Sequence, residues 1–321
     1  PGTGAVSAAV PVAVVICTRD RPDALGRCLA ALRAGEARPA ELVVVDQGRG
    51  GSAAPVVEPL RAEGWPVVYL PQEPRGLAAA QNAGVLAASA PAVAVTDDDC
   101  IPDPGWLAAV ARTLAAGEVD VLAGRVLAAE PSGERRLPVS TRTSTVRRDF
   151  RGRQVPWHVG SGNNFALTRE WYLRVGGCDE RLGPGSPGQG GVDMDLFYRL
   201  LRAGARVRYE PDALVLHERQ TAADRRARRP LYGHGMGAAC GIWLRQGDAY
   251  ALPVLARWLL LRLARAARPA DTGRLEALRE EAAILGSTAR GLVFGLRAGS
   301  AYPAGGVRPK RWMEKGARSS G

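Results

Sequence analysis

The most informative part of this sequence is the stretch Ala92-Val93-Ala94-Val95-Thr96-Asp97-Asp98-Asp99. Its first five residues are apolar or β-branched, and they have the length of a short buried strand. Three consecutive aspartates follow, so a large negative charge is expected where that strand ends. Hard cations such as Mg²⁺ or Mn²⁺ bind carboxylate oxygens and complete their shell with phosphate oxygens. The stretch therefore predicts a metal site beside a sheet, and the alternative is a solvated acidic turn.

Similar short apolar runs alternate with helix-compatible segments before this stretch. The expected strands are residues 12–17, 42–46, 67–70 and 92–96, and the expected helices are 22–33 and 76–88. Such alternation is typical of βαβ units and a parallel sheet. In these sheets ligands bind at the carboxyl ends of the strands. We therefore expect the polar residues that follow three of the runs to share one crevice: Thr18, Arg19, Asp20, Asp46 and the three aspartates.

The second half of the chain predicts a further ordered block and then a helical region. Residues 131–156 are rich in Arg, Ser, Thr and Pro and predict a mobile surface loop or lid. The elements expected after it are strands 163–167, 205–209 and 214–216, and helices 169–175, 192–203, 222–245, 251–268 and 272–290. The Gly-rich basic residues 299–321 are expected to be a disordered tail.

Several polar residues at element ends are candidates for ligand contacts, each with a plain structural alternative. Asp46 either caps a helix or accepts a hydrogen bond from a base imide or a ribose hydroxyl. Gly76 begins a helix whose free N–H groups, with Arg75, could face a diphosphate. Gly162, Asn163 and Asn164 form either an ordinary turn or a flexible contact to sugar hydroxyls.

Two further candidates have the chemistry of a base and of a metal ligand. Asp193 and Asp195 begin an amphipathic helix, and either of them could cap it while the other removes a proton from an acceptor hydroxyl. Their spacing leaves both assignments open. His217 ends the apolar run 214–216, and it is either structural or a ligand of a metal already bound by aspartate.

The composition of the chain limits the classes of protein to which it can belong. Apolar residues make up 46% of the 321 residues, enough for a sizeable core. The five cysteines are scattered without a CxxC pair, so a zinc site or a disulfide framework is not indicated and a cytoplasmic location is expected. The formal charge of +11 favours anionic partners without choosing among nucleotides, phospholipid and nucleic acid. We expect no signal peptide and no membrane span.

Taken together, these segments resemble glycosyltransferase family 2, a large group of inverting enzymes with the GT-A fold. That fold is an α/β arrangement, a Rossmann-like and mostly parallel sheet flanked by helices. The matching pieces occur in the family's order: VICTRDRP (15–22), VVVD (43–46), RGL (75–77) with NAG (82–84), TDDD (96–99), GNNFA (162–166), VGGCDE (175–180), and DMDL (193–196) followed by Arg199, Leu200 and Gly204. The resemblance implies a GT-A catalytic domain over residues 10–218 and a C-terminal helical region over 219–298.

The resemblance also implies roles for single residues at the donor and metal sites. Asp97 and Asp99 match the outer positions of the DxD motif, so Asp99 is expected to hold Mn²⁺ or Mg²⁺, and Asp97 the ribose or the metal. His217 stands where some members place a metal or diphosphate ligand. The remaining residues expected at the nucleoside-diphosphate sugar are Thr18, Arg19, Asp46, Arg75, Gly76 and Asp98.

At the acceptor side, Asp193 matches the acid that serves as the catalytic base, although Val192 replaces the Glu that usually precedes it. Trp157, Gly162, Asn163 and Asn164 are expected to contact the acceptor or the sugar. The predicted activity is metal-dependent, inverting hexosyl transfer to an acceptor hydroxyl. The alternatives are a sugar-phosphate nucleotidyltransferase and a non-enzymatic basic module that binds anionic membrane or nucleic acid. If the protein is a glycosyltransferase, no nucleic-acid partner is expected.

The C-terminal region is unusually rich in arginine. Ten arginines and two acids lie between residues 219 and 268, with Trp243 and Trp258 among them. An apolar stripe bordered by arginine, Arg262 included, is expected from Leu252, Leu255, Leu259 and Leu263. Such helices can lie on the inner face of an anionic membrane, form a homodimer, or pack on their own domain. These three outcomes stay open at this point.

Overall fold

Strands and helices alternate along the first half of the chain as the apolar runs predict. The computed structural model describes residues 8–130, 137–267 and 274–299. Four parallel strands come first: β1 (Ala8–Thr18), β2 (Ala37–Asp46), β3 (Val67–Pro71) and β4 (Ala92–Asp97). The central residues of β1, β2 and β4 are buried on both faces of the sheet, which is why they are continuous apolar runs rather than alternating ones, whereas β3 is only half-buried.

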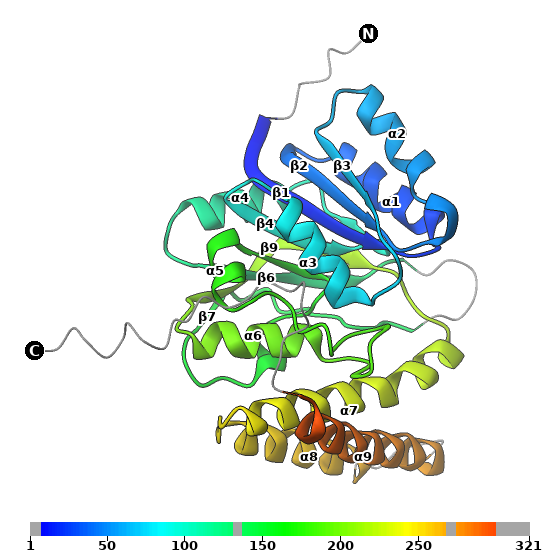
Figure 1. Cartoon of the computed structure of the whole chain (residues 1–321), viewed down its shortest axis with the longest axis vertical. Coiled ribbons are helices and arrows are strands. Elements are labelled where there is room, and N and C mark those ends of the chain that lie inside the picture. The colour runs from blue at the N-terminus through cyan, green and yellow to red at the C-terminus, as the bar shows by residue number, and fades with distance from the viewer. Residues whose placement is uncertain (1–7, 131–136, 268–273, 300–321) are drawn as a thin grey trace, which may run out of the picture.

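Five more strands complete one mixed sheet within the described part of the chain (Figure 1). The strand order is β3-β2-β1-β4-β8-β6-β9-β5, and β7 pairs with β9. Strand β8 is antiparallel to its neighbours β4 and β6, whereas β6 and β9 are parallel. The bounds are β5 (Cys100–Pro102), β6 (Val121–Ala128), β7 (Arg148–Phe150), β8 (Asn164–Thr168) and β9 (Val207–His217).

Helices cover both faces of this sheet and divide the core into two apolar clusters. Helices α1 (Pro22–Arg33), α2 (Ala54–Ala62) and α4 (Trp106–Ala115) pack on one face. Helices α3 (Leu77–Ala87), α5 (Arg169–Arg174) and α6 (Val192–Arg202) pack on the other. Side chains of β1 alternate between the clusters, since Val14 and Ile16 belong to the first and Ala13 and Val15 to the second.

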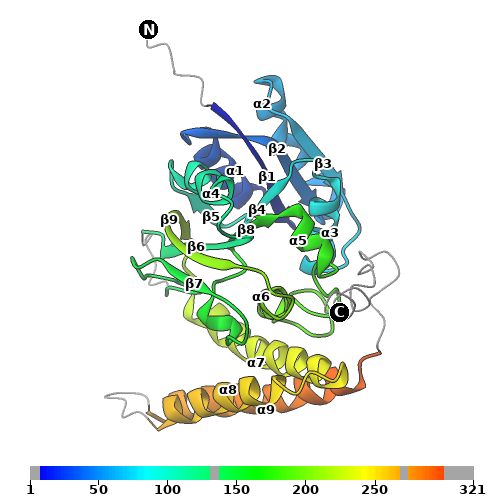
Figure 2. The same ribbon diagram turned by 90° about the vertical axis from the view of Figure 1, so that its left-hand side faces the viewer.

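Helices α7 (Ala222–Arg245), α8 (Ala251–Ala266) and α9 (Arg274–Arg297) pack together below α6, as Figures 1 and 2 show. Gly233, Gly237 and Gly241 follow one another at intervals of four in α7, and all three face α9. Because glycine has no Cβ, the two helix backbones come into direct contact there. A Cβ at Gly237 would collide with the carbonyl oxygen of Thr288.

Two expectations from the sequence need correction, and a third falls largely outside the described residues. The two strands expected over 205–209 and 214–216 are one strand, β9, with a register shift against β6 between Gly124 and Arg125. The expected loop 131–156 contains β7 and isolated bridges to β6 and to Gln220, so its described part is tied to the fold. Residues 131–136, and the expected tail from residue 300 onward, lie outside the described residues.

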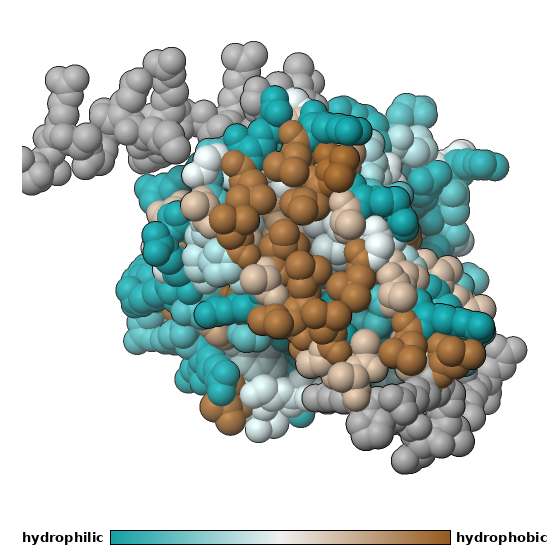
Figure 3. All heavy atoms as spheres, turned by 90° about the horizontal axis from the view of Figure 1, so that it is seen from below, coloured by the Kyte–Doolittle hydropathy of each residue, from teal (hydrophilic) through white to brown (hydrophobic). Residues whose placement is uncertain are grey.

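The predicted stripe of α8 is only partly exposed. Leu255 and Leu259 pack against the core, whereas Leu252 and Leu263 are exposed. Arg262 is only 7% exposed, so it does not border the stripe at the surface as expected. The end of the molecule formed by these helices carries a broad apolar band (Figure 3), and its exposed apolar residues include Leu260, Leu275, Leu278, Val293 and Leu296. Contact of this face with a membrane or a second copy stays a prediction.

Within the described residues, no helix has the length and hydropathy needed to cross a bilayer.

Candidate active site

A cavity of about 1050 Å³ lies where β1, β4 and β9 end. Its wall includes residues of the acidic triplet, of the 138–142 and 157–163 segments, and of α6, α7 and α8. A crevice is therefore present at the polar ends of β1 and β4, although Asp20 and Asp46, which were expected there, do not line it. The C-terminal helices help to enclose it. That contribution was not visible from the sequence, because it depends on how these helices fold back on the sheet.

The three aspartates of the triplet have different surroundings. Asp98 is only 1% exposed, and it accepts hydrogen bonds from Thr18 Oγ1 at 2.7 Å and from Arg21 Nε at 3.1 Å. Arg21 Nη1 also donates to Asp99 Oδ2 at 2.9 Å. Asp98 and Thr18 also line the cavity, and their contact with the donor stays a prediction.

Asp99 and Asp97 keep carboxylate oxygens at the cavity. Oδ1 of Asp99 is buried and has no hydrogen-bond partner among the described residues. Although burial opposes ionisation, His217 and Arg21 lower the pKa of Asp99. Burial, followed by the like charge of Asp99, raises the pKa of Asp97 to about 7. An ionised Asp97 therefore needs a nearby positive charge.

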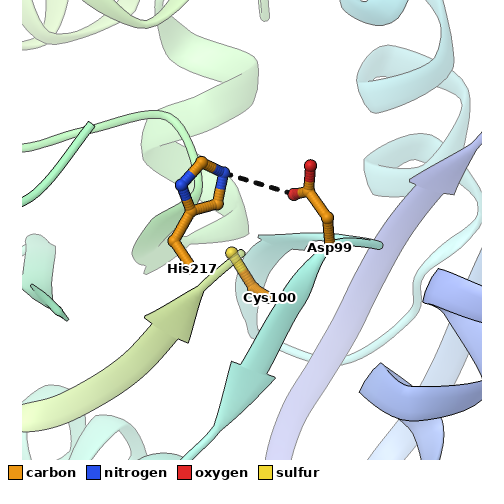
Figure 4. A group of neighbouring side chains, drawn as sticks. All are labelled: Asp99, Cys100 and His217. Carbon is orange, nitrogen blue, oxygen red and sulfur yellow. Dashed lines mark ion pairs between the residues drawn. The ribbon is translucent and has the colours of Figure 1, made fainter. Parts of the chain in front are cut away.

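His217 reaches the triplet from the end of β9. Its Nε2 lies 3.3 Å from Oδ1 of Asp99 (Figure 4). Its Nδ1 lies 3.1 Å from the carbonyl oxygen of Val139. The pairing of Cys100 with His217 across β5 and β9 brings this histidine to Asp99. A cluster of possible ligand atoms results, from Asp99, Cys100 and His217. Burial raises the pKa of the Cys100 thiol, so it stays protonated and leaves carboxylate oxygen and imidazole nitrogen as the available ligands.

The other expected donor contacts fall into two groups. Arg19 and Gly76 line the cavity, and Gly76 has a φ of 92°, which favours glycine. Asp46 and Arg75 do not line it. Asp46 accepts hydrogen bonds from Gly48 N, Ala53 N and Tyr69 Oη, and Arg75 pairs with Glu180 at 3.1 Å. The carboxylate of Asp46 is thus engaged within the protein, whereas Arg75 is half exposed, and donor contact by either residue stays a prediction.

Some residues of the cavity wall were not predicted from the sequence. Gln47 follows β2 directly and lines the cavity, with its Nε2 donating to Gln72 at 2.8 Å and to the carbonyl of Gly76 at 3.1 Å. Its position after a strand end, beside the singled-out Asp46, was the available signal. The arginines of α7 and α8 in the wall were noted only as surface charge: Arg225, Arg228, Arg229, Arg262 and Arg265.

The two aspartates that begin α6, Asp193 and Asp195, have different surroundings. Asp193 lines the cavity, and its Oδ2 accepts a hydrogen bond from Gly162 N at 2.9 Å. Burial raises the pKa of Asp193, which is the usual tuning of a general base. Asp195 is buried in an ion pair with Arg199 at 2.6 Å and accepts a hydrogen bond from Trp243 Nε1 at 2.8 Å. Only Asp193 faces the cavity.

The segment before β8 holds Asp193 and adds polar atoms to the wall. A Cβ at Gly162 would lie 2.9 Å from Cβ of Asp193, so only glycine lets the main chain come this close. Asn163 is buried beside the cavity, and its amide atoms have no partner among the described residues. Asn164 accepts from Trp106 and donates to two carbonyls away from the cavity, which differs from the expected acceptor contact. Trp157 lines the cavity as expected.

A family model described as glycosyl transferase family 2 matches residues 13–176. The chain belongs to glycosyltransferase family 2. The predicted family and the GT-A fold are thus confirmed. The match covers the end of β1, the triplet and Asn163, but it ends before Asp193 and His217.

Two curated relatives of this family 2 chain, both from Mycobacterium tuberculosis, are pre-mycofactocin glycosyltransferases. Each is 30% identical over 301 residues, which cover 83% of this chain. The chain spans 60% of the length of these relatives.

Solved structures agree with the GT-A fold. S. aureus TarS in complex with UDP-GlcNAc has a TM-score of 0.60 at 14% identity, covering 88% of this chain and 81% of that one. The mannosyltransferase PcManGT from Pyrobaculum calidifontis, in complex with GDP-Man and Mn²⁺, has a TM-score of 0.53 at 17% identity, covering 89% and 84%. At these identities the likeness concerns the fold.

Proposed function

We propose that this family 2 protein is a metal-dependent, inverting glycosyltransferase that moves a hexosyl group from a nucleoside-diphosphate sugar to an acceptor hydroxyl. The observation that carries the proposal is that one cavity contains both a carboxylate suited to be a base, Asp193, and the Asp99–His217 pair beside Asp97. A base and a site for the leaving diphosphate are the two parts that a single displacement requires.

Asp99, Asp97 and His217 would hold a divalent cation, Mn²⁺ or Mg²⁺. Oδ1 of Asp99 has Nε2 of His217 at 3.3 Å and no other partner among the described residues, and this set of oxygen and nitrogen donors suits such a hard ion. When bound, the ion would neutralise negative charge on the diphosphate. The structure of PcManGT, which has the same fold, contains GDP-Man and Mn²⁺. Arg21 would keep Asp98 and Asp99 in place through its contacts with both.

In the proposed reaction, Asp193 accepts the proton of the acceptor hydroxyl while that oxygen attacks the anomeric carbon. The Gly162 N–H holds Oδ2 of Asp193 and fixes the orientation of the carboxylate. Attack from the face opposite the leaving diphosphate inverts the configuration at that carbon. No covalent enzyme intermediate forms, so no side-chain nucleophile is needed. Asn163, with free amide atoms in the wall, would contact hydroxyl groups of the sugar or the acceptor.

The rival activity, sugar-phosphate nucleotidyl transfer, is less well supported. It would call for a glycine-rich phosphate loop after the first strand and a nearby catalytic lysine. Cys17, Thr18 and Arg19 follow β1 instead, and the only lysines of the chain are Lys310 and Lys315, close to its end.

Thermal unfolding with UDP, GDP and dTDP, each with and without Mn²⁺, tests the donor site. We expect one of these diphosphates to raise the melting temperature, and to do so more strongly with Mn²⁺ than without it. The diphosphate that acts identifies the base of the donor. If no nucleoside diphosphate shifts the transition under either condition, the proposal is wrong.

A further inference from the structure

A second cavity, of about 550 Å³, adjoins the first and shares wall residues with it. Its wall contains four arginines, two tryptophans and no acidic side chain: Arg142, Arg257, Arg262, Arg265, Trp157 and Trp258. We call these six residues the arginine–tryptophan cluster. All of them except Arg257 also line the first cavity, so the two spaces meet at the cluster.

The positive charge of the cluster is poorly balanced by the protein. Glu281 lies 3.5 Å from Arg262, but the same carboxylate also pairs with Arg229 at 3.0 Å. Nε of Arg262 is buried without a hydrogen-bond partner among the described residues. Arg142 donates to main-chain carbonyls, at 2.7 Å in the case of Gly160. In the described part of the chain, no carboxylate forms an ion pair with Arg142, Arg257 or Arg265.

The electrostatic consequence is visible at neighbouring groups. Burial, and then the charge of Arg265, lowers the pKa of Arg262 to about 10. Burial together with the charges of Arg142 and Arg257 lowers the pKa of His158, whose ring lies beside Trp157. A buried cation that is not fully paired is costly, and an anion placed next to it removes part of that cost. The wall is therefore suited to a negatively charged group.

The aromatic part of the cluster adds a second kind of contact. The rings of Trp157 and Trp258 lie 5.7 Å apart at an angle of 60°, and the guanidinium of Arg262 lies 4.3 Å from the ring of Trp258. Tryptophan contributes a large apolar surface. Trp157 belongs to the short helix Pro156–His158, which leads directly to Gly162 at the proposed base. Most of the cluster also lines the same cavity as Asp193, so a molecule held at the cluster could extend towards Asp193.

We propose that the arginine–tryptophan cluster is the acceptor subsite, and that the acceptor carries an oxyanion, a phosphate or a carboxylate, next to a flat apolar or sugar-ring surface. This inference rests on the proposed function, since it names the class of acceptor at the same site. The arginines bind the oxyanion and the tryptophans pack against the ring. The acceptor hydroxyl then extends towards Asp193.

Calorimetric titration with a charged and an uncharged aryl probe tests the subsite. The probes are 4-nitrophenyl phosphate and 4-nitrophenyl β-glucoside, added at low ionic strength with and without UDP and Mn²⁺. Arg257→Gln and Arg265→Gln are suitable variants because both side chains are exposed, so the fold should persist. Arg279→Gln is the matched control, an exposed arginine of α9 that lines neither cavity.

We expect the aryl phosphate to bind the wild-type protein and the Arg279→Gln control equally. Its affinity should fall about tenfold in each of the other two variants, the size of one lost charge-assisted contact. Binding of the glucoside and of UDP with Mn²⁺ should not change.

Failure of the aryl phosphate to bind, or equal binding by all variants, would overturn the subsite. An equal loss of UDP affinity in Arg257→Gln and Arg265→Gln would assign these arginines to the donor diphosphate instead, which also contradicts it. Failure of the proposed function has a different signature, because none of UDP, GDP and dTDP would then bind with Mn²⁺ to any form of the protein, while the aryl phosphate titration still reports on the cluster.

Discussion

Replacing Asp193 by Asn should stop sugar transfer while leaving donor binding and the fold intact. The amide has nearly the same shape as the carboxylate, and its oxygen can still accept the hydrogen bond from Gly162 N, which is 2.9 Å long in the native protein. The amide cannot accept the proton of an acceptor hydroxyl. The change therefore removes the base and little else.

The expected size of the loss follows from the role of the residue. A positioned general base contributes about 10²- to 10⁴-fold to a rate. At about 1.36 kcal/mol per factor of ten, the activation free energy should rise by roughly 3–5 kcal/mol. Stability should not fall, because burial raises the pKa of Asp193 and so already favours its uncharged form in the folded protein. An uncharged amide avoids the same desolvation cost.

Asp195→Asn is the matched control, two residues further along α6. It removes the negative charge that faces Arg199 at 2.6 Å and weakens the contact with Trp243. Breaking a buried ion pair costs about 3–5 kcal/mol of stability, so its melting temperature should fall. Transfer per folded molecule should persist. The assay is single-turnover sugar transfer with the donor in excess, with thermal unfolding on the same samples. If Asp193→Asn transfers at the native rate, or Asp195→Asn is folded but inactive, the assignment of the base is wrong.

Four further results are expected. Asp99→Asn should lose the effect of Mn²⁺ on UDP affinity while keeping its fold; native activity of this variant in EDTA would contradict the metal site. The value of kcat/KM should fall as pH decreases through the pKa of Asp193, because only the ionised base accepts a proton. Burial should place the midpoint of this fall above about 3.9, the ordinary aspartate pKa. A midpoint at or below that value would argue against Asp193. Gly237→Ala should lower the free energy of unfolding by about 1–3 kcal/mol, because the new Cβ collides with the Thr288 carbonyl. The control Gly286→Ala has room for its Cβ and should be neutral or stabilising. Chemical denaturation measures both. If the apolar face with Leu260 and Leu263 contacts a membrane, the protein should sediment with anionic vesicles, less so as salt rises; a dimer that hides these leucines and leaves the vesicles unbound would reject membrane contact.

The first half of the fold was predictable because its strands are buried on both faces. Continuous apolar runs such as 43–45 and 93–95 mark central parallel strands without any knowledge of their partners. Strand β6 and helix α4 were missed. In β6, Gly124 and Arg125 interrupt the apolar pattern, and the glycine is needed because a Cβ there would collide with Asn164. That requirement comes from a strand about forty positions away in the chain.

The candidate site was predictable in its residue types but not in its pairings. A run of three aspartates indicates charge at a strand end, yet which of them stays available depends on Arg21, 77 positions from Asp98. Likewise, the spacing alone left Asp193 and Asp195 equivalent, and only the family resemblance favoured Asp193. Trp243 of α7 and Arg199 engage Asp195, and that distinction arises only when α7 packs on α6. The cavity arginines of α8 depend on the same long-range packing.

The most direct test of the account is a product analysis with a panel of nucleoside-diphosphate sugars. The protein would be incubated with each sugar nucleotide and Mn²⁺, and separately with nucleoside triphosphates and sugar 1-phosphates. We predict release of a nucleoside diphosphate from at least one sugar nucleotide, at a rate that falls strongly in Asp99→Asn. Release of inorganic diphosphate from a triphosphate and a sugar phosphate, with no reaction of any sugar nucleotide, would contradict glycosyl transfer and favour nucleotidyl transfer.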